Sequence, residues 1–197
     1  CGDIVVVSGS VRMDGTSLHY LPMEFPAVPS YQLLKALEES SVSLGFHTTV
    51  GVSITKDSFY TQAEPETKPV SDDLIRRWQS YVRGGAVCTS MEESILFSVG
   101  SSLGIRTASI LVSATNFDGS VPKRNSADVY PTDSIQKPIL SAIEALRGSS
   151  GRTRADLPPD IKTAPCRRHG AVLLYHISPP YSRRYSSSSS ASRSSRA

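Results

Sequence analysis

The sequence predicts an α/β sandwich in which amphipathic helices cover a central, largely parallel sheet. Runs rich in β-branched residues alternate with segments whose apolar residues recur at helical spacing. The first run, residues 4–7, is continuously apolar, which is typical of a strand buried on both faces. The chain of 197 residues is long enough for one core-forming domain but not comfortably for two.

The expected strands and helices alternate in a regular order. Strands are predicted at residues 4–7, 48–54, 86–88 and 107–112, and helices at 30–43, 72–82, 91–103 and 137–146. Ser30 and Ser71 can cap the first two helices. Pro138 either sits in the first turn of the last helix or kinks it.

Long irregular connections separate several of these elements. In open α/β folds, ligands bind at the loops beyond the carboxyl ends of the strands. We therefore expect a site built from the loops 8–29, 55–70, 88–92 and 113–130, the first three facing one cavity.

Charge divides the chain near residue 147. Residues 1–146 hold 11 basic and 16 acidic residues, whereas residues 147–197 hold 10 basic and 2 acidic ones. We predict a domain at 1–147 and a basic, Ser/Arg-rich tail at 148–197, largely disordered, with 171–177 as its one strand-like piece. The tail could contact nucleic acid, but unstructured or wrongly translated sequence explains its composition more simply, so no nucleic-acid partner is expected.

The cysteines and histidines are scattered along the chain. Cys1, Cys88 and Cys166 form no CxxC pair and the histidines lack metal-ligand spacing, so neither a disulfide framework nor a metal site is expected. A reducing compartment, the cytoplasm, is the simpler interpretation. No apolar run is long enough to span a membrane. Because the chain opens directly on a buried type of strand, we expect an N-terminal part to be missing.

Met91 and Glu92 stand at the start of a predicted helix, directly after a short strand. A carboxylate held there could accept hydrogen bonds from two vicinal sugar hydroxyls, with the Met against the sugar face. The alternative is that Glu92 and Glu93 only complement the dipole of the first helical turn.

Phe59 and Gln62 lie in the second long loop. The Gln amide offers one acceptor and two donors, which match the O=C–N–H edge of a pyrimidine, and Phe59 could stack on a base or sugar. The alternative is an ordinary loop with one packed aromatic ring.

Ser8, Gly9 and Arg12 follow the first predicted strand. Hydroxyl groups, backbone N–H groups and a cation suit an oxyanion such as phosphate. The segment lacks the spacing of a Walker or dinucleotide loop, so this indication is weak by itself.

Taken together, these segments resemble the uridine phosphorylases, members of the wider purine nucleoside phosphorylase and uridine phosphorylase superfamily. The matching segments are GDIVVVSGSVRMDGTS (2–17), HYLPMEFPA (19–27), DSFYTQ (57–62), SME (90–92) and LGIRT (103–107). Their order and spacing fit the family across about residues 2–146. The resemblance implies a three-layer sandwich around a mixed, largely parallel sheet.

The family's reaction is phosphorolysis of a nucleoside, in which phosphate attacks C1′ of the ribose and the base leaves. The resemblance implies that Met91 and Glu92 bind the ribose, with Glu92 as the catalytic residue. It also implies that Phe59 and Gln62 bind the base and that Ser8 and Gly9 contact phosphate. No metal or organic cofactor is expected, since phosphate is the co-substrate. The partners implied are nucleoside, phosphate and further copies of the chain, as a hexamer.

The sequence departs from the family's pattern at several positions. Ser90 and Glu93 flank Met91-Glu92 where the family commonly has Glu and Ser, and Thr67 and Ala114 stand where an Arg is usual. We expect the chain as given to be inactive or nearly so, because the family's main phosphate cations precede Cys1. The alternatives are a purine nucleoside phosphorylase, a nucleosidase that uses water, or an inactive homologue acting as a binding protein.

Overall fold

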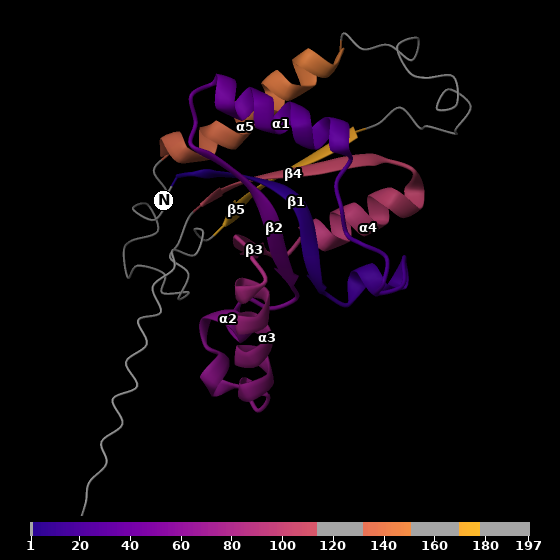
Figure 1. Ribbon diagram of the computed structural model, residues 1–197, viewed down its shortest axis with the longest axis vertical. Coiled ribbons are helices and arrows are strands. Elements are labelled where there is room, and N and C mark those ends of the chain that lie inside the picture. The colour runs from indigo at the N-terminus through magenta and orange to yellow at the C-terminus, as the bar shows by residue number, and fades with distance from the viewer. Residues whose placement is uncertain (1, 114–131, 151–169, 178–197) are drawn as a thin grey trace, which may run out of the picture.

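The computed structural model describes residues 2–113, 132–150 and 170–177 (Figure 1). Its strands are β1 Ile4–Met13, β2 Thr48–Lys56, β3 Cys88–Ser90, β4 Arg106–Ser113 and β5 Gly170–Ile177. Its helices are η1 Thr16–His19, α1 Tyr31–Ser43, α2 Tyr60–Ala63, η2 Pro65–Thr67, α3 Ser71–Arg83, α4 Glu93–Leu103 and α5 Thr132–Ser150. No helix in these ranges is long and apolar enough to cross a bilayer.

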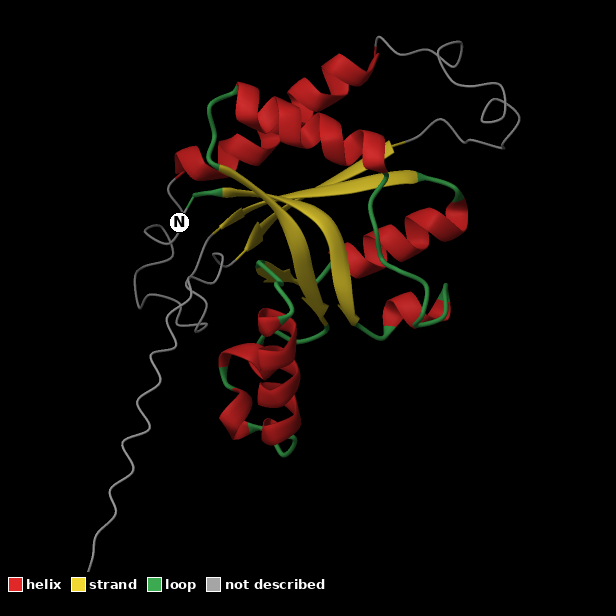
Figure 2. Cartoon of the chain, viewed as in Figure 1, coloured by secondary structure: helices red, strands yellow, loops and turns green. Residues whose placement is uncertain are grey.

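The strands form one mixed sheet in the order β3-β2-β1-β4-β5 (Figure 2). Neighbours β1 and β2, β2 and β3, and β4 and β5 run parallel, whereas β1 and β4 run antiparallel. The carboxyl ends of β1, β2 and β3 therefore meet at one edge of the sheet, called the carboxyl edge below. The mixed, largely parallel sheet agrees with the predicted fold class.

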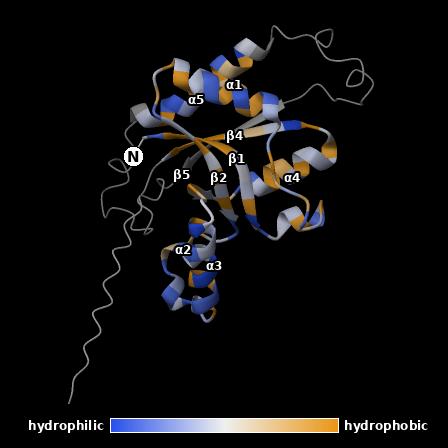
Figure 3. Ribbon diagram, viewed as in Figure 1, coloured by the Kyte–Doolittle hydropathy of each residue, from blue (hydrophilic) through white to orange (hydrophobic). Residues whose placement is uncertain are grey.

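Two apolar clusters cover the two faces of the sheet and create three layers. Ile4 and Val6 of β1 face Leu37 and the other buried residues of α1 and α5, whereas Val5 and Val7 face Phe97 of α4. Alternate side chains of one strand enter different cores, so the prediction of a strand buried on both faces is confirmed. Figure 3 shows the apolar colour concentrated in the central strands.

Strand β1 continues well beyond the predicted boundary at residue 7. The register with β2 shifts between Val7 and Gly9, so Ser8 is the extra residue of a β-bulge, and pairing resumes through Met13 opposite Lys56. The expectation that residues 8–13 belong to a loop is therefore wrong. A bulge interrupts the alternation of side chains without ending the hydrogen-bonded pairing of the two strands. The continuation of β1 depends on this pairing with β2, which is remote in the sequence.

The remaining boundaries differ from the prediction by varying amounts. Helices α1 and α3 lie where they were predicted, and β3 lies two residues later than expected. Helix α5 begins at Thr132, so Pro138 lies in its interior. Strand β5 pairs with β4 along its whole length, which confirms the strand-like piece expected at residues 171–177. The tail residues 151–169 and 178–197 and the predicted site loop at 114–130 lie outside the described residues.

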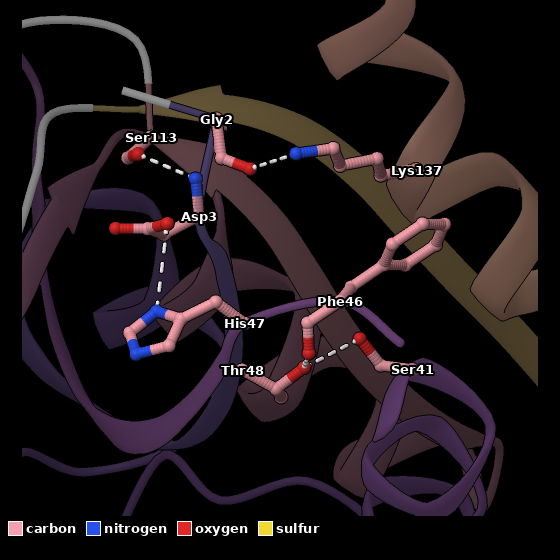
Figure 4. A network of polar contacts seen from close by, with 8 residues as sticks. All are labelled: Gly2, Asp3, Ser41, Phe46, His47, Thr48, Ser113 and Lys137. Atoms are coloured by element: carbon pink, nitrogen blue, oxygen red, sulfur yellow. Dashed lines mark hydrogen bonds and ion pairs between the residues drawn. The ribbon is translucent and has the colours of Figure 1, made fainter. Parts of the chain in front are cut away.

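Polar contacts fasten the amino end of β1, away from the carboxyl edge (Figure 4). The Asp3 amide donates to Ser113 Oγ at 3.1 Å, and Lys137 Nζ of α5 donates to the Gly2 carbonyl at 2.8 Å. The Asp3 carboxylate lies 3.4 Å from His47 Nδ1 just before β2. These contacts tie β1, β2, β4 and α5 together at the end of the sheet opposite the candidate site.

Helix α4 approaches β4 closely at Gly100. A Cβ atom on Gly100 would lie 2.5 Å from Thr107 Cγ2 and 3.2 Å from the Ile105 carbonyl oxygen. We expect Gly100→Ala to lower the free energy of unfolding by about 1–3 kcal/mol, because the helix must move away from the sheet. Urea denaturation measures this, with Gly148→Ala in α5 as control. A Cβ on Gly148 meets nothing within 4 Å, so that variant should be neutral or slightly stabilised. Equal stabilities of the two variants would contradict the close packing.

Candidate functional site

The carboxyl edge of the sheet brings together segments that are remote in the sequence. Thr55 pairs with Ser90, so the segments that follow β2 and β3 leave the sheet side by side. Phe59 and Gln62 lie on the first segment, and Glu92 lies on the second. In Figure 1, β1 and β2 end near η1 and near the projecting α2 and α3. Gln62 and Glu92 thus lie on segments that leave the same edge of the sheet. That the two residues face one cavity stays a prediction.

Glu92 is the half-buried residue immediately before α4. Its Oε2 accepts a hydrogen bond from the Met91 amide at 3.0 Å, and its own amide donates to Ser90 Oγ at 3.4 Å. Burial raises the pKa of Glu92, whereas the Met91 amide and the Lys56 charge lower it. Oε1 accepts no hydrogen bond from the described part of the chain, so one carboxylate oxygen remains available to a ligand.

Buried contacts position the start of α4 behind Glu92. The Ser94 amide donates to Thr55 Oγ1 of β2 at 3.0 Å, and Ser94 Oγ donates to Asp14 Oδ2. Asp14 also accepts from the Ser17 amide at 2.6 Å and from Ser17 Oγ at 3.0 Å. The first turn of α4 is therefore fixed to both β2 and η1, which restricts where Glu92 can lie.

Glu93 points into the protein and is fully buried. Its Oε1 accepts a hydrogen bond from Ser109 Oγ of β4 at 3.3 Å, while Oε2 is buried without a partner among the described residues. Burial raises the pKa of Glu93 to about 7, and the Glu92 charge acts in the same direction. The sequence indicated no role for Glu93 beyond complementing the helix dipole. Its position where the family commonly has Ser was the one signal that marked it.

Lys56 is the last residue of β2 and is only 6% exposed. Its Nζ donates to Thr89 Oγ1 at 2.8 Å and to the Ser90 carbonyl at 3.4 Å. Burial lowers the pKa of Lys56 to about 8, although the charges of Glu92 and Glu93 oppose that shift. Lys56 was not identified as a site residue from the sequence. A lysine that ends a predicted strand directly before a site loop was the available signal.

Phe59 and Gln62 lie at and within the short helix α2. The Phe59 ring is partly exposed and packs edge-on against Tyr60, with centroids 5.8 Å apart. Gln62 Oε1 is buried without a hydrogen-bond partner among the described residues. An unpaired buried amide oxygen is costly, so it is a candidate acceptor for a ligand donor. The assignment of Phe59 and Gln62 to a base stays a prediction.

Ser8 and Gly9 lie inside β1, away from its carboxyl end. Gly9 pairs with Val52, four residues before the end of β2. The sequence placed them in a loop, and the structure places them at the bulge described above. Bulges re-aim side chains and are frequent beside active sites. Contact between these two residues and phosphate stays a prediction.

Arg12 does not serve as a free cation. Its guanidinium is buried and donates to Ser17 Oγ and to three carbonyl oxygens, those of Leu21, Pro22 and Phe25, at 2.5–3.1 Å. Four of its five N–H groups are thereby used within the chain. The interpretation of Arg12 as an oxyanion ligand is therefore wrong, because the residue holds the segment after η1 against β1.

The fold and the side chains at its carboxyl edge define an α/β domain of the nucleoside phosphorylase type. A family model described as the phosphorylase superfamily matches residues 1–136. The chain belongs to the phosphorylase superfamily, which confirms the resemblance indicated by its motifs.

Several curated proteins are similar to the chain. It is 30% identical to a uridine phosphorylase from Treponema pallidum over 145 residues, which cover 74% of the chain and 56% of that protein. It is 37% identical to a uridine phosphorylase from Salmonella typhimurium over 124 residues, 58% of the chain and 47% of that protein. A guanosine phosphorylase from Halorubrum lacusprofundi is 28% identical over 152 residues, 74% of the chain and 58% of that protein. The chain thus spans about half the length of the curated relatives it matches.

Proposed function

We propose that the protein catalyses phosphorolysis of a pyrimidine nucleoside, uridine in the first place, to free base and ribose 1-phosphate. The observation that carries this proposal is Glu92 at the carboxyl edge, where one carboxylate oxygen accepts no hydrogen bond from the described residues. The motif around it resembles that of the uridine phosphorylases. The similarity to curated uridine phosphorylases supports the same activity.

In the proposed reaction Glu92 accepts hydrogen bonds from the ribose hydroxyls and fixes the sugar so that C1′ meets phosphate. Met91, which is exposed beside it, contacts the apolar face of the sugar. Gln62 binds the pyrimidine edge, Phe59 packs against the nucleoside, and the bulge of β1 faces phosphate. Orientation and stabilisation of charge on sugar and base supply the catalysis, because no covalent enzyme intermediate is needed.

We further propose that the protein is a cytoplasmic homo-oligomer, a hexamer by its resemblance to the family. Large apolar side chains around η1 remain exposed in the single chain, namely Leu18, Tyr20, Met23, Phe25 and Val28. Covering them against a second copy would remove apolar area from water.

The experiment that tests the activity measures release of free base from uridine, thymidine and inosine by the full-length protein, with and without phosphate. We expect base release from uridine that requires phosphate. Preferential cleavage of inosine would favour the purine alternative, for which the guanosine phosphorylase relative is the specific support. Cleavage without phosphate would indicate a nucleosidase, and no cleavage at all would favour a binding protein.

A further inference from the structure

The ammonium group of Lys56 is buried at the carboxyl edge, directly behind the segment that carries Glu92. It donates to a side chain and to a backbone carbonyl of the neighbouring strand, at Thr89 Oγ1 and Ser90 O. Thr89 Oγ1 in turn donates to the Ile54 carbonyl at 2.9 Å. The final residues of β3 are therefore bound to β2 through side chains as well as through the ladder.

The bonds from Lys56 lead directly to the proposed ribose-binding acid. The Ser90 carbonyl accepts a hydrogen bond from Lys56 Nζ, and the Ser90 hydroxyl accepts one from the Glu92 amide. A displacement of Lys56 would therefore disturb Thr89 and Ser90, the residues that lead the chain from β3 to Glu92.

Lys56 is also the positive charge that faces the acids at the start of α4. The titratable groups facing it are the Cys88 thiol from β3 and the carboxyl groups of Glu92 and Glu93. Arg12 of β1 donates its hydrogen bonds to carbonyl groups, and Asp14, which follows β1, accepts hydrogen bonds from Ser17 and Ser94. No carboxylate of the described residues lies within 4.0 Å of the Lys56 ammonium in an ion pair, so its charge acts through space rather than by direct pairing.

We propose that Lys56 is a positioning residue for the ribose-binding acid: it fixes the end of β3 and supplies the positive charge opposite Glu92. This inference rests on the proposed function, because it names what orients the acid that we assign to ribose. A buried cation has a high cost of desolvation, and two hydrogen bonds to uncharged groups offset only part of it. A lysine buried at such a cost is more readily explained by a role at the site than by stability.

The charge and the hydrogen bonds of Lys56 have separable consequences. The positive charge favours the ionised form of Glu92 against the effect of burial, and an ionised carboxylate makes the stronger hydrogen bonds to hydroxyl groups. Without Lys56, Glu92 should titrate at higher pH and be ionised to a smaller extent at neutral pH. The hydrogen bonds set where the carboxylate lies.

The test compares Lys56→Met, Lys56→Arg and the control Lys35→Met in the full-length protein. Lys35 is an exposed lysine on α1, so its substitution removes the same charge away from the site. Titration of the Glu92 carboxyl by carbon NMR and uridine affinity from pH 5 to 9 are the readouts. Lys56→Met should raise the titration midpoint of Glu92 and weaken uridine binding about tenfold at pH 7. Lys56→Arg should restore part of both effects, and Lys35→Met should change neither.

A Lys56→Met protein with the wild-type midpoint and the wild-type uridine affinity would overturn the inference. An equal loss of uridine affinity at every pH, without a shift of the titration midpoint of Glu92, would overturn the claim that the Lys56 charge acts on Glu92. Should Lys56→Met not fold, Lys56→Gln supplies a second neutral variant that keeps a hydrogen-bond donor. If the wild-type protein binds no uridine, the proposed function fails, and the Glu92 titration still decides whether Lys56 controls that carboxyl.

Discussion

Glu92→Ala is expected to lower kcat/KM for uridine by about 10²-fold or more in the full-length protein. A carboxylate that accepts hydrogen bonds from two ribose hydroxyls makes charge-assisted bonds worth about 1.5–3 kcal/mol each. Their loss leaves the sugar free to rotate away from phosphate. Because Glu92 is half-buried and precedes α4, its removal should leave the fold intact. Steady-state kinetics at saturating phosphate measure the effect.

Two control variants test whether the loss of activity is specific to the Glu92 carboxylate. Glu39→Ala removes an exposed acid from α1 and should leave kcat/KM unchanged. Glu93→Gln keeps the shape of the neighbouring buried side chain and should retain far more activity than Glu92→Ala. If Glu92→Ala kept the wild-type rate, or if Glu93→Gln proved the more damaging change, the placement of the ribose site would be wrong.

Glu93→Gln is expected to change how stability depends on pH. Burial raises the pKa of Glu93 from 4.5 to about 7, so the folded state binds a proton that the unfolded state has lost between these values. The contribution of Glu93 is therefore most favourable below pH 4.5 and is lost as pH rises through 7. The full loss above pH 7 is about 3 kcal/mol. Glu93→Gln, which stays neutral, should match the wild type near pH 4 and exceed its stability at pH 8.

Urea denaturation between pH 4 and 8 tests this difference between the two proteins. Glu92 also has a raised pKa and contributes a slope of the same sign, but that slope is common to both and cancels in the comparison. Lys56 remains charged over most of this range, since its pKa is about 8. Curves that run parallel from pH 4 to 8 would mean that Glu93 is not the buried proton-binding group.

Much of the fold could be predicted because its signals are local. The apolar run Ile4–Val7 indicated a strand buried on both faces, and the amphipathic stripe of α3 indicated its bounds within a residue or two. The continuation of β1 to Met13 could not be predicted from residues 8–13 alone. Polar residues and a glycine interrupt the pattern there, and the pairing with β2 that keeps them in the strand is a tertiary effect.

The residues of the candidate site were also only partly predictable from the sequence. Glu92 and Gln62 were identified because their motifs are contiguous in the sequence and resemble those of a known family. Lys56 and Glu93 were missed because their importance arises from burial, which depends on the register between Thr55 and Ser90 and on the approach of α4 to β4. Arg12 was misassigned because a short sequence window does not reveal that the carbonyls of the following loop turn back onto it.

We expect phosphate, not water, to open the glycosidic bond at the site of Glu92. Phosphorus NMR of the full-length protein with uridine and inorganic phosphate tests it most directly. We expect inorganic phosphate to be consumed while a ribose 1-phosphate signal grows in step with released uracil. Glu92→Ala should nearly abolish both changes. Uracil release with the phosphate signal unchanged, or growth of the sugar phosphate at the wild-type rate in Glu92→Ala, would contradict it.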